Sequence, residues 1–432
     1  MSDNIKVSLF DLAMSMSDAM DLVTPKVVDH HKLVAYIAAE LGEEYGMSNN
    51  EIKDLIITGL LHDSGALSLQ ERLDTLRFEG EVPHRHSEKG YRLLRDFQPL
   101  AKVARIIRYH HVPWQNAEQI SAQLEEKIPV ESHVIHLADR VSVLLDRDKQ
   151  YIDSQERKKI KQKILQQKGK TFAPELVEAF ESLADKEYFW LDLTYPALGE
   201  RLLSKKIAGS MTVLSMDELK TFSMAMQRLI DFRSSFTATH SSGVSTTALE
   251  LAKLTGFSKL ECDMMEIAGH FHDLGKLAVP NEILNKPGKL TDEEFSIIRY
   301  HTYYTYRSLE RIPQLETINL WAALHHERLD GQGYPFQYSN YDLPLGSKVM
   351  AVADVFTALT EDRPYREGMP KEKVSNILKE MSETNKLDSA LVELLLSNYE
   401  HINNSRDQAQ TQAGQVFENF NHVDNQSVEQ FA

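Results

Sequence analysis

The stretches EIKDLIITGLLHD (51–63) and ECDMMEIAGHFHD (261–273) are apolar helical segments, and each ends in a His-Asp pair. Around each pair, further histidines and aspartates recur at almost the same spacing. The first set is His30, His62, Asp63, His86, His110, His111 and Asp139, and the second is His240, His272, Asp273, His301, His325, His326 and Asp354. Ten of the 17 histidines belong to these two sets, which argues against unrelated structural histidines.

The two sets are in register along the chain. Their first three members are offset by 210 residues and their last four by 215. The change of offset falls between Asp273 and His301, which indicates a five-residue insertion there. A repeat with this register predicts two domains of one fold in tandem.

Bulk composition agrees with two soluble domains. At 432 residues, each domain is long enough to bury a core, and the hydrophobic and charged contents of 42% and 26% are ordinary for globular proteins. The sequence contains no apolar run of 18 residues, so it predicts no membrane-spanning helix. The acidic N-terminus does not resemble a secretory signal. The single cysteine, Cys262, excludes an internal disulfide framework and favours a cytoplasmic protein.

The net charge of −16 argues against binding of a DNA or RNA polymer, because such surfaces are basic. A small anionic substrate remains compatible with this charge. It would need a local cluster of cations, or metal ions, inside an acidic protein.

The chain is predicted to be helical almost throughout, so the fold class is all-α. Apolar residues follow a helical period after both His30 and His240. We expect a first domain over 1–205, a connecting helix within 211–233, a second domain over 206–405 and a polar tail over 406–432. The tail is rich in Gln and Asn, which is typical of a frayed helix or a disordered segment.

The residue types of the two sets indicate a metal centre. Nitrogen and oxygen ligands suit iron, manganese or zinc, and the lack of thiolates argues against structural zinc. Adjacent histidines on a helix point about 100° apart, so both need not bind one ion. Seven such groups can hold two metals around a bridging carboxylate, an arrangement that activates water for phosphoester hydrolysis.

The paired His-Asp pattern resembles the HD superfamily of all-helical, metal-dependent phosphohydrolases. The second copy resembles more narrowly the HD-GYP cyclic dinucleotide phosphodiesterases, over about residues 230–385. The motifs that carry this resemblance are HDLGKLAVP (272–280), NEILNKPGKLTDEEFSIIRYH (281–301), HHERLDGQGYP (325–335) and ADVFTALTEDRPYR (353–366). The resemblance implies hydrolysis of cyclic di-GMP to pGpG or GMP, or of cyclic GMP-AMP.

The resemblance also implies roles for individual residues. The seven residues of the second set would bind the metals, with Asp273 bridging, and Lys276 would face the scissile phosphate or the bridging water. Arg363 and Arg366 would contact the phosphates, although surface salt bridging is the alternative for both. The GYP loop would consist of Gly331, Gly333, Tyr334 and Pro335, of which the last three are expected to bind substrate. The alternative for Tyr334 is that it only holds the loop.

Three departures from the family pattern affect these expectations. Relatives with a third metal carry a carboxylate where this chain has Phe236, so we expect two metal ions, iron first and manganese as a substitute. FQYSNYDLPL (336–345) replaces a glycine-rich stretch. Thr357 stands where some relatives have an acid, and both of these changes bear on base specificity.

The first copy keeps all seven ligand-type residues and loses the other motifs. Ala66 replaces Lys276, HHVPWQN (110–116) replaces the GYP segment, and no DRPYR follows. It resembles a degenerate HD domain with a second metal site, and three readings stay open: a regulatory module that binds metal or nucleotide, a hydrolase with another substrate, or a structural, dimerising domain. His31 and His136 are interpreted as ordinary helix residues.

The function predicted from the sequence is that of a bacterial cytoplasmic cyclic dinucleotide phosphodiesterase, with a homodimer left open. A catalytically silent sensor and a general HD nucleotidase are the alternatives. The combination of Lys276, a complete GYP loop and DRPYR argues against both.

Overall fold

The computed structural model describes residues 5–22, 29–75, 84–146, 151–194, 196–208, 212–234, 237–286, 288–362 and 367–422, with only the backbone of 69 and 196–200. The described chain separates into two units, formed mainly by Ser8–Thr212 and by Val213–Asn421. The described residues are almost entirely helical, which confirms the predicted all-α class. A two-stranded sheet pairs β1 (Val7–Ser8) with β2 (Val213–Leu214).

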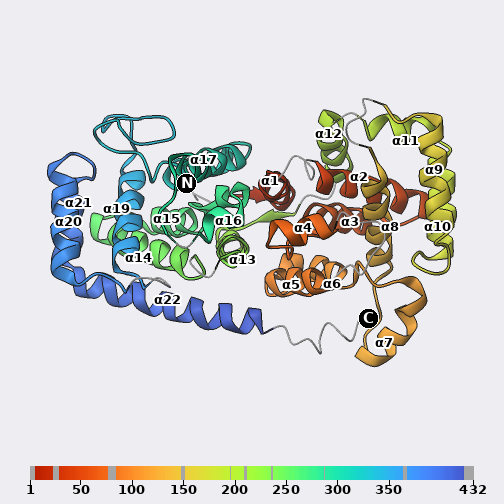
Figure 1. Cartoon of the computed structure of the whole chain (residues 1–432), viewed down its shortest axis with the longest axis horizontal. Coiled ribbons are helices and arrows are strands. Elements are labelled where there is room, and N and C mark those ends of the chain that lie inside the picture. Colours follow the sequence, from red (N-terminus) through yellow and green to blue (C-terminus); the bar gives the residue numbers. More distant parts are fainter. Residues whose placement is uncertain are drawn as a thin grey trace. The chain divides into compact units, whose positions relative to one another are not determined.

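The N-terminal unit is a helical bundle in which α2 packs against α3 and α8 (Figure 1). Its helices are α1 (Leu9–Asp21), α2 (His30–Tyr45), α3 (Asn49–Leu61), α4 (Leu69–Thr75), α5 (Arg85–Leu94), α6 (Ala101–Tyr109), α7 (Ala117–Leu124), α8 (Val130–Leu144), α9 (Ser154–Leu165), α10 (Pro174–Ala184), α11 (Glu187–Asp192) and α12 (Pro196–Ile207).

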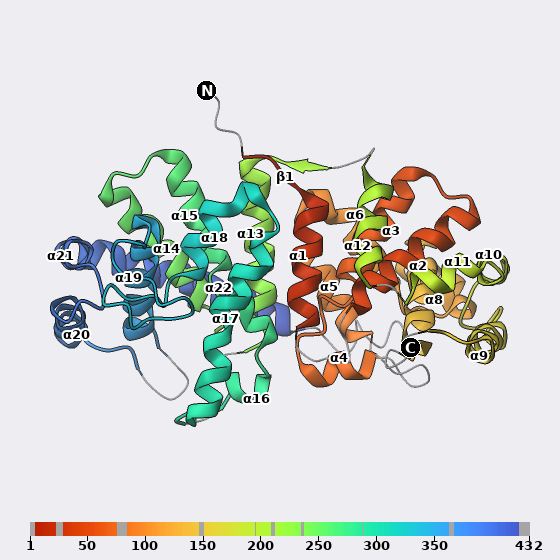
Figure 2. The same cartoon turned by 90° about the horizontal axis from the view of Figure 1, so that it is seen from above.

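The C-terminal unit repeats this plan, with α14 packed against α15, α19 and α22 (Figure 2). Its helices are α13 (Met216–Asp231), α14 (His240–Thr255), α15 (Lys259–Phe271), α16 (Asn281–Leu284), α17 (Asp292–Glu310), α18 (Glu316–Ala323), α19 (Leu345–Thr360), α20 (Lys371–Glu383), α21 (Ser389–Ser397) and α22 (Tyr399–Asn421), and the short 3-10 helix η4 (Leu274–Ala278) follows α15.

The helices that carry the His-Asp pairs begin with the same local chemistry. Ser258 and Glu261 form a capping box at the start of α15, in which each side chain binds the backbone N–H of the other. Ser48 and Glu51 form the equivalent box in α3. Such boxes satisfy N–H groups that a helix leaves unpaired, so they fix where each helix begins. Because both helices are 13 residues long, they also end at equivalent points, just before the His-Asp pairs.

Glycine sets the contact between the first two helices of each repeat. A Cβ on Gly269 would lie 2.5 Å from Ser245 Cα, and a Cβ on Gly59 would lie 2.5 Å from Ala35 Cα. Only glycine allows the backbones to approach this closely. The close packing of α14 on α15 brings His240 near the His-Asp pair at the end of α15.

The polar tail expected from residue 406 is instead part of α22, a continuous helix that ends at Asn421. Ile402 and Phe420 of this helix are buried against the unit, while Val416 is exposed. Two polar side chains, Arg406 and Gln410, are buried as well. The sequence showed weak apolar periodicity because hydrogen-bonded polar groups occupy part of the inward face. The second unit thus continues past residue 405.

Candidate metal centre

The seven ligand-type residues of the C-terminal unit come from five helices or their ends, and the structure brings them together. His240 begins α14, His272 and Asp273 follow α15, and His301 lies within α17. His325 and His326 follow α18, and Asp354 lies in α19. Six of them form two groups of potential metal ligands, one with His240, His272 and Asp273 and the other with His301, His325 and His326. The seventh, Asp354, lies 3.1 Å from His240 Nε2 through its Oδ1.

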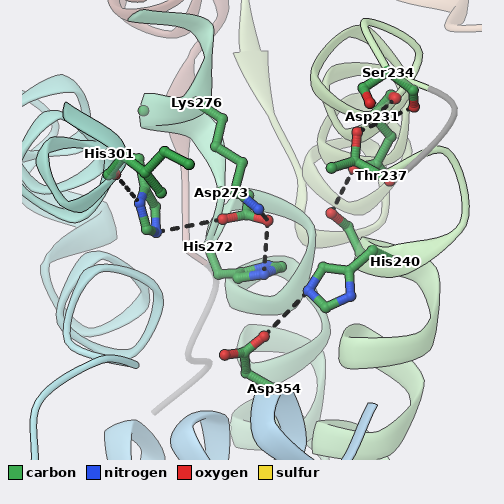
Figure 3. A network of polar contacts seen from close by, with 12 residues as sticks. Asp231, Ser234, Thr237, His240, His272, Asp273, Lys276, His301 and Asp354 are labelled. Atoms are coloured by element: carbon green, nitrogen blue, oxygen red, sulfur yellow. Dashed lines mark hydrogen bonds and ion pairs between the residues drawn. The ribbon is translucent and has the colours of Figure 1, made fainter. Parts of the chain in front are cut away.

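Asp273 lies between the two groups (Figure 3). Its Oδ2 is 3.2 Å from His272 Nε2, and its Oδ1 is 3.5 Å from His301 Nε2. One oxygen therefore faces each group, which is the placement that a bridging carboxylate requires. Burial raises the pKa of Asp273, but the contacts with His272, Lys276 and His301 hold it well below its usual range, so the group is a carboxylate.

His301 and His325 present ring nitrogens that protein groups cannot satisfy together. Their Nδ1 atoms lie 2.6 Å from the carbonyls of Ile298 and Ala322, which can only accept, so each Nδ1 donates. Burial lowers the pKa of both rings, that of His301 to about 3, and the rings are neutral. Each Nε2 then carries a lone pair, yet the two lie 3.3 Å apart. A cation that both nitrogens bind resolves this arrangement.

His272 repeats the same logic next to Asp273. Its Nδ1 donates to the Gly269 carbonyl at 2.8 Å, which leaves Nε2, 3.2 Å from Asp273 Oδ2, as the ring nitrogen available to a metal. This nitrogen is buried and has no hydrogen-bond partner, and a buried polar atom without a partner is unfavourable. The donor set, imidazole and carboxylate without thiolate, fits iron, manganese or zinc.

His240 differs from these rings because both of its nitrogens face carboxylates. Its Nε2 lies 3.1 Å from Asp354 Oδ1, and its Nδ1 lies 3.0 Å from Glu361 Oε2. Glu361 and Asp354 raise the pKa of His240 to about 10 against the effect of burial. A metal on Nε2 would displace a proton, as metal binding to histidine generally does.

Lys276 supplies a cation beside the centre. Its Nζ donates to Asp273 Oδ2 at 2.6 Å, and 18% of its side chain is exposed. The opening extends to His326, whose side chain is 29% exposed and whose Nδ1 lies 3.8 Å from Asp354 Oδ2. The centre is thus accessible on the side of Lys276 and His326, while the other ligands are buried.

The GYP loop lies against this accessible side. The Tyr334 ring is 4.9 Å from the His326 ring, and the Arg299 guanidinium stacks on Tyr334 at 4.5 Å. Glu327 is buried and accepts backbone N–H groups from three consecutive residues, Phe336 at 2.7 Å and Gln337 and Tyr338 at 3.1 Å. This carboxylate fixes the segment that follows Pro335, and so fixes the loop beside His326.

Several residues singled out in the sequence lie outside the described residues, namely Phe236, Arg363 and Arg366. Gly333 is described, and a Cβ there would lie 2.4 Å from Arg328 N, so the loop packs closely at this point. Thr357 is buried and lies 3.4 Å from Thr247 through their hydroxyls.

The N-terminal unit assembles its seven residues in the same way. The structure forms one group from Asp63, His86, His110 and His111 and another from His30, His62 and Asp63. Asp63 again lies between them, 3.4 Å from both His62 Nε2 and His86 Nε2. Both ring nitrogens of His111 are buried without a hydrogen-bond partner. This donor set also fits a metal.

The N-terminal centre differs in its surroundings. Ala66 is buried where the other unit has Lys276. Arg140 Nη2 lies 2.6 Å from Asp139 Oδ2, at a position that is Val355 in the second repeat. His31, interpreted as an ordinary helix residue, contacts the Asp21 carboxylate through Nδ1, and its ring is 5.3 Å from that of His62.

Sequence reasoning missed four polar residues around the C-terminal centre: Asp231, Arg299, Glu327 and Glu361. Asp231 is buried and accepts the Ser241 hydroxyl at 2.7 Å. Its counterpart at the 210-residue offset is Asp21, so a comparison of the two repeats would have shown an aspartate at this position in both. The counterpart of Glu361 at the 215-residue offset is Asp146, which is also an acid but is exposed, so the repeat alone does not mark Glu361 as a buried group.

Comparison with known proteins agrees with the geometry. Models of the HD domain match residues 27–144 and 224–391. The 3′3′-cGAMP-specific phosphodiesterase 1 of Vibrio cholerae is 31% identical over 91% of this chain and 92% of its own length. The cyclic di-GMP phosphodiesterase response regulator RpfG of Xanthomonas campestris is 36% identical over 38% of this chain and 44% of its own.

A crystal structure of a cyclic GMP-AMP-specific phosphodiesterase of V. cholerae superposes with a TM-score of 0.63 over 91% of this chain and 98% of that one, at 24% identity, which shows the fold. Fold and site define this protein as a tandem HD-domain protein. Because a relative that matches over nine-tenths of both chains is 31% identical, the chain belongs to the HD-GYP family of cyclic dinucleotide phosphodiesterases.

Proposed function

We propose that the C-terminal unit is a metal-dependent phosphodiesterase that hydrolyses a cyclic dinucleotide second messenger to a linear dinucleotide and on to mononucleotides. The observation that carries this proposal is the pair of ligand groups with Asp273 between them: it belongs to the group of His240 and His272 and lies 3.5 Å from His301 of the other group, and Lys276 contacts the same carboxylate. The substrates we propose are 3′,3′-cyclic GMP-AMP and cyclic di-GMP. We propose 3′,3′-cyclic GMP-AMP as the preferred substrate, because two relatives that match across both units are named for it.

Two metal ions, iron first and manganese as a substitute, would supply an activated water and neutralise the phosphate. Asp273 would bridge them, and the six other residues of the second set would complete the ligands. Lys276 would stabilise the negative charge that develops on the phosphate, because a fixed cation in a partly buried site acts strongly there.

The loop residues would position the substrate. We propose that Tyr334, whose ring is 4.9 Å from that of His326, contacts a phosphate that enters near Lys276, together with Gly333 and Pro335. We propose that Arg363 and Arg366 contribute the remaining phosphate contacts. We also propose that residues 206–421 form the catalytic domain of a cytoplasmic protein, and that residues 1–205 form a metal-binding regulatory domain.

Within the described residues, no helix is long and apolar enough to cross a bilayer. The test uses the purified chain of 432 residues, loaded anaerobically with iron or with manganese. It is offered each cyclic dinucleotide and a mononucleotide, and the products are resolved by chromatography. Opening of either ring supports the proposal. Mononucleotide dephosphorylation alone would favour a general nucleotidase, and metal binding without turnover would favour a sensor.

A further inference from the structure

Glu361 lies behind the metal ligand His240, on the side away from Asp354. The carboxylate is buried, and His240 Nδ1 lies 3.0 Å from its Oε2 and 3.2 Å from its Oε1. The opposite ring nitrogen faces Asp354 inside the centre (Figure 3). Glu361 thus contacts the ring nitrogen that remains when Nε2 binds a metal.

The three other buried histidines have a weaker partner at this position. Nδ1 of His272, His301 and His325 donates to the backbone carbonyl three residues earlier, at 2.8, 2.6 and 2.6 Å. A carboxylate makes the imidazole a stronger electron donor than a carbonyl does and fixes the ring orientation. His240 is therefore the ligand whose metal affinity depends most on a side chain.

The N-terminal unit makes the corresponding contact without a charge. His30 Nδ1 lies 3.1 Å from the Ser142 hydroxyl, which is neutral. Ser142 occupies the register of Thr357 rather than of Glu361. The negative charge behind the first ligand is thus a difference between two units that otherwise share their ligand sets.

Helix α22 holds the Glu361 carboxylate in place. Gln410 Nε2 donates to Glu361 Oε2 at 3.0 Å and to the Thr239 carbonyl at 3.3 Å, next to His240. The Gln410 carbonyl oxygen accepts from Arg406 Nη1. Both α22 side chains are buried, at 9% and 4% exposure, so the contacts are shielded from water.

The packing of α14 leaves room for the Gln410 amide. A Cβ on Gly243 would lie 2.8 Å from Gln410 Nε2 and 2.8 Å from Thr357 Cγ2. Glycine inside a helix is destabilising relative to alanine. The N-terminal repeat has Leu33 at this position. The glycine is explained by the space that the amide needs.

We infer that Glu361 is a positioning residue for His240, and that Gln410 of α22 sets the position of Glu361. The C-terminal helix, which lies outside the sequence motifs, therefore controls the metal affinity of the catalytic centre. This inference rests on the proposed function, because it requires that the C-terminal group binds metal. It extends that function to residues about 50 positions beyond Asp354.

The test measures Mn²⁺ affinity by competition with a chelating dye. The background is the full-length chain with His62→Ala and Asp63→Ala, so that the measured metal belongs to the C-terminal unit. Glu361→Gln keeps the size of the side chain and removes its charge, and we expect 10- to 100-fold weaker binding. Turnover should recover at saturating Mn²⁺, since Glu361 acts through His240 and does not touch substrate.

Gln410→Met tests the second link, with Gln408→Met on the exposed face of α22 as its matched control. We expect Gln410→Met and Gly243→Ala to weaken Mn²⁺ binding several-fold and Gln408→Met to leave it unchanged. A merely structural role would lower the thermal midpoint without changing Mn²⁺ affinity. The visible spectrum of the Co²⁺-loaded chain should also change in Glu361→Gln, because it reports the ligand field.

Unchanged Mn²⁺ affinity in both Glu361→Gln and Gln410→Met would overturn the inference while leaving the proposed function intact. If Glu361→Gln does not fold, Gln410→Met decides the question. A background chain that binds no Mn²⁺ at its C-terminal unit would instead overturn the proposed function together with this inference.

Discussion

Lys276 Nζ donates to Asp273 Oδ2 at 2.6 Å, so the lysine cation and the central carboxylate of the metal centre are directly paired. The N-terminal unit has Ala66 at the position of Lys276. The two units have the same ligand residue types, so the presence of Lys276 in only one of them is the clearer difference between the two centres.

Lys276→Met should lower kcat by about 10²- to 10³-fold, the range observed for loss of one group that stabilises developing charge. Metal content should stay the same, because lysine is not a ligand. Steady-state kinetics and elemental analysis measure the two quantities. Lys253→Met, at an exposed lysine, is the control. Wild-type turnover in Lys276→Met would contradict a role for this amine.

Asp273→Ala should abolish turnover and lower the metal content of the C-terminal unit. The reason is that both ligand groups lose the carboxylate that faces each of them. Elemental analysis in the His62→Ala/Asp63→Ala background measures the loss. Asp292→Ala, at an exposed acid on α17, should bind metal like the parent. Full metal content in Asp273→Ala would show that this residue does not bridge.

Glu327→Ala should raise KM for the cyclic dinucleotide while leaving metal content unchanged. The backbone N–H groups of Phe336, Gln337 and Tyr338 lose their acceptor, and an unpaired buried group costs about 1–3 kcal/mol. The segment would rearrange, and Tyr334 would no longer be held beside His326. Glu327→Gln, which keeps one acceptor oxygen, should lie between the two. The exposed Glu393→Ala is the control, and equal KM values would contradict this role.

Asp231 predicts a pH dependence of stability. Burial raises the pKa of its carboxyl to about 7 from an ordinary 3.8, so the folded chain binds a proton that the unfolded chain has released between these pH values. This contribution to stability is present in full below about pH 4 and is lost as the pH rises toward 7, by at most about 1.4 kcal/mol per pH unit.

Asp231→Asn should remove this slope, because an amide does not titrate. Urea unfolding of the metal-free chain between pH 4.5 and 7.5 measures the difference in unfolding free energy from the parent. The difference should move in favour of Asp231→Asn as the pH rises. Asp217→Asn, at an exposed position, provides the baseline. Parallel pH profiles for parent and Asp231→Asn would disprove the prediction.

The N-terminal unit should bind metal and influence the other unit. His62→Ala/Asp63→Ala should lower the total metal content and change the rate or KM of cyclic dinucleotide hydrolysis. A neighbour can exert such an effect only if two states of the chain differ in metal binding. Identical kinetics in the variant and the parent would show that this domain does not regulate hydrolysis under those conditions.

The sequence predicted the all-α class, the duplication and the residues that meet at each centre. These features follow from hydrophobic periodicity and residue spacing. When two copies of one fold have equal spacing between their ligand residues, those residues occupy equivalent positions in both copies. Glu361 and Gln410 could not be predicted in this way. Their role depends on a long-range contact between α22 and the end of α19, and no local pattern encodes the direction of a single buried amide. For α22, the sequence left a frayed helix and a disordered segment open, because buried polar side chains such as Arg406 and Gln410 weaken its apolar periodicity.

The glycines at the α2–α3 and α14–α15 contacts have a consequence for variation. Because the helix backbones touch at Gly59 and Gly269, the distance from the first histidine to the His-Asp pair is set by backbone contact and not by side-chain size. The five-residue insertion between Asp273 and His301 lies downstream of that contact. The segment between Asp273 and His301 can therefore lengthen without changing the distance between the first histidine and the His-Asp pair.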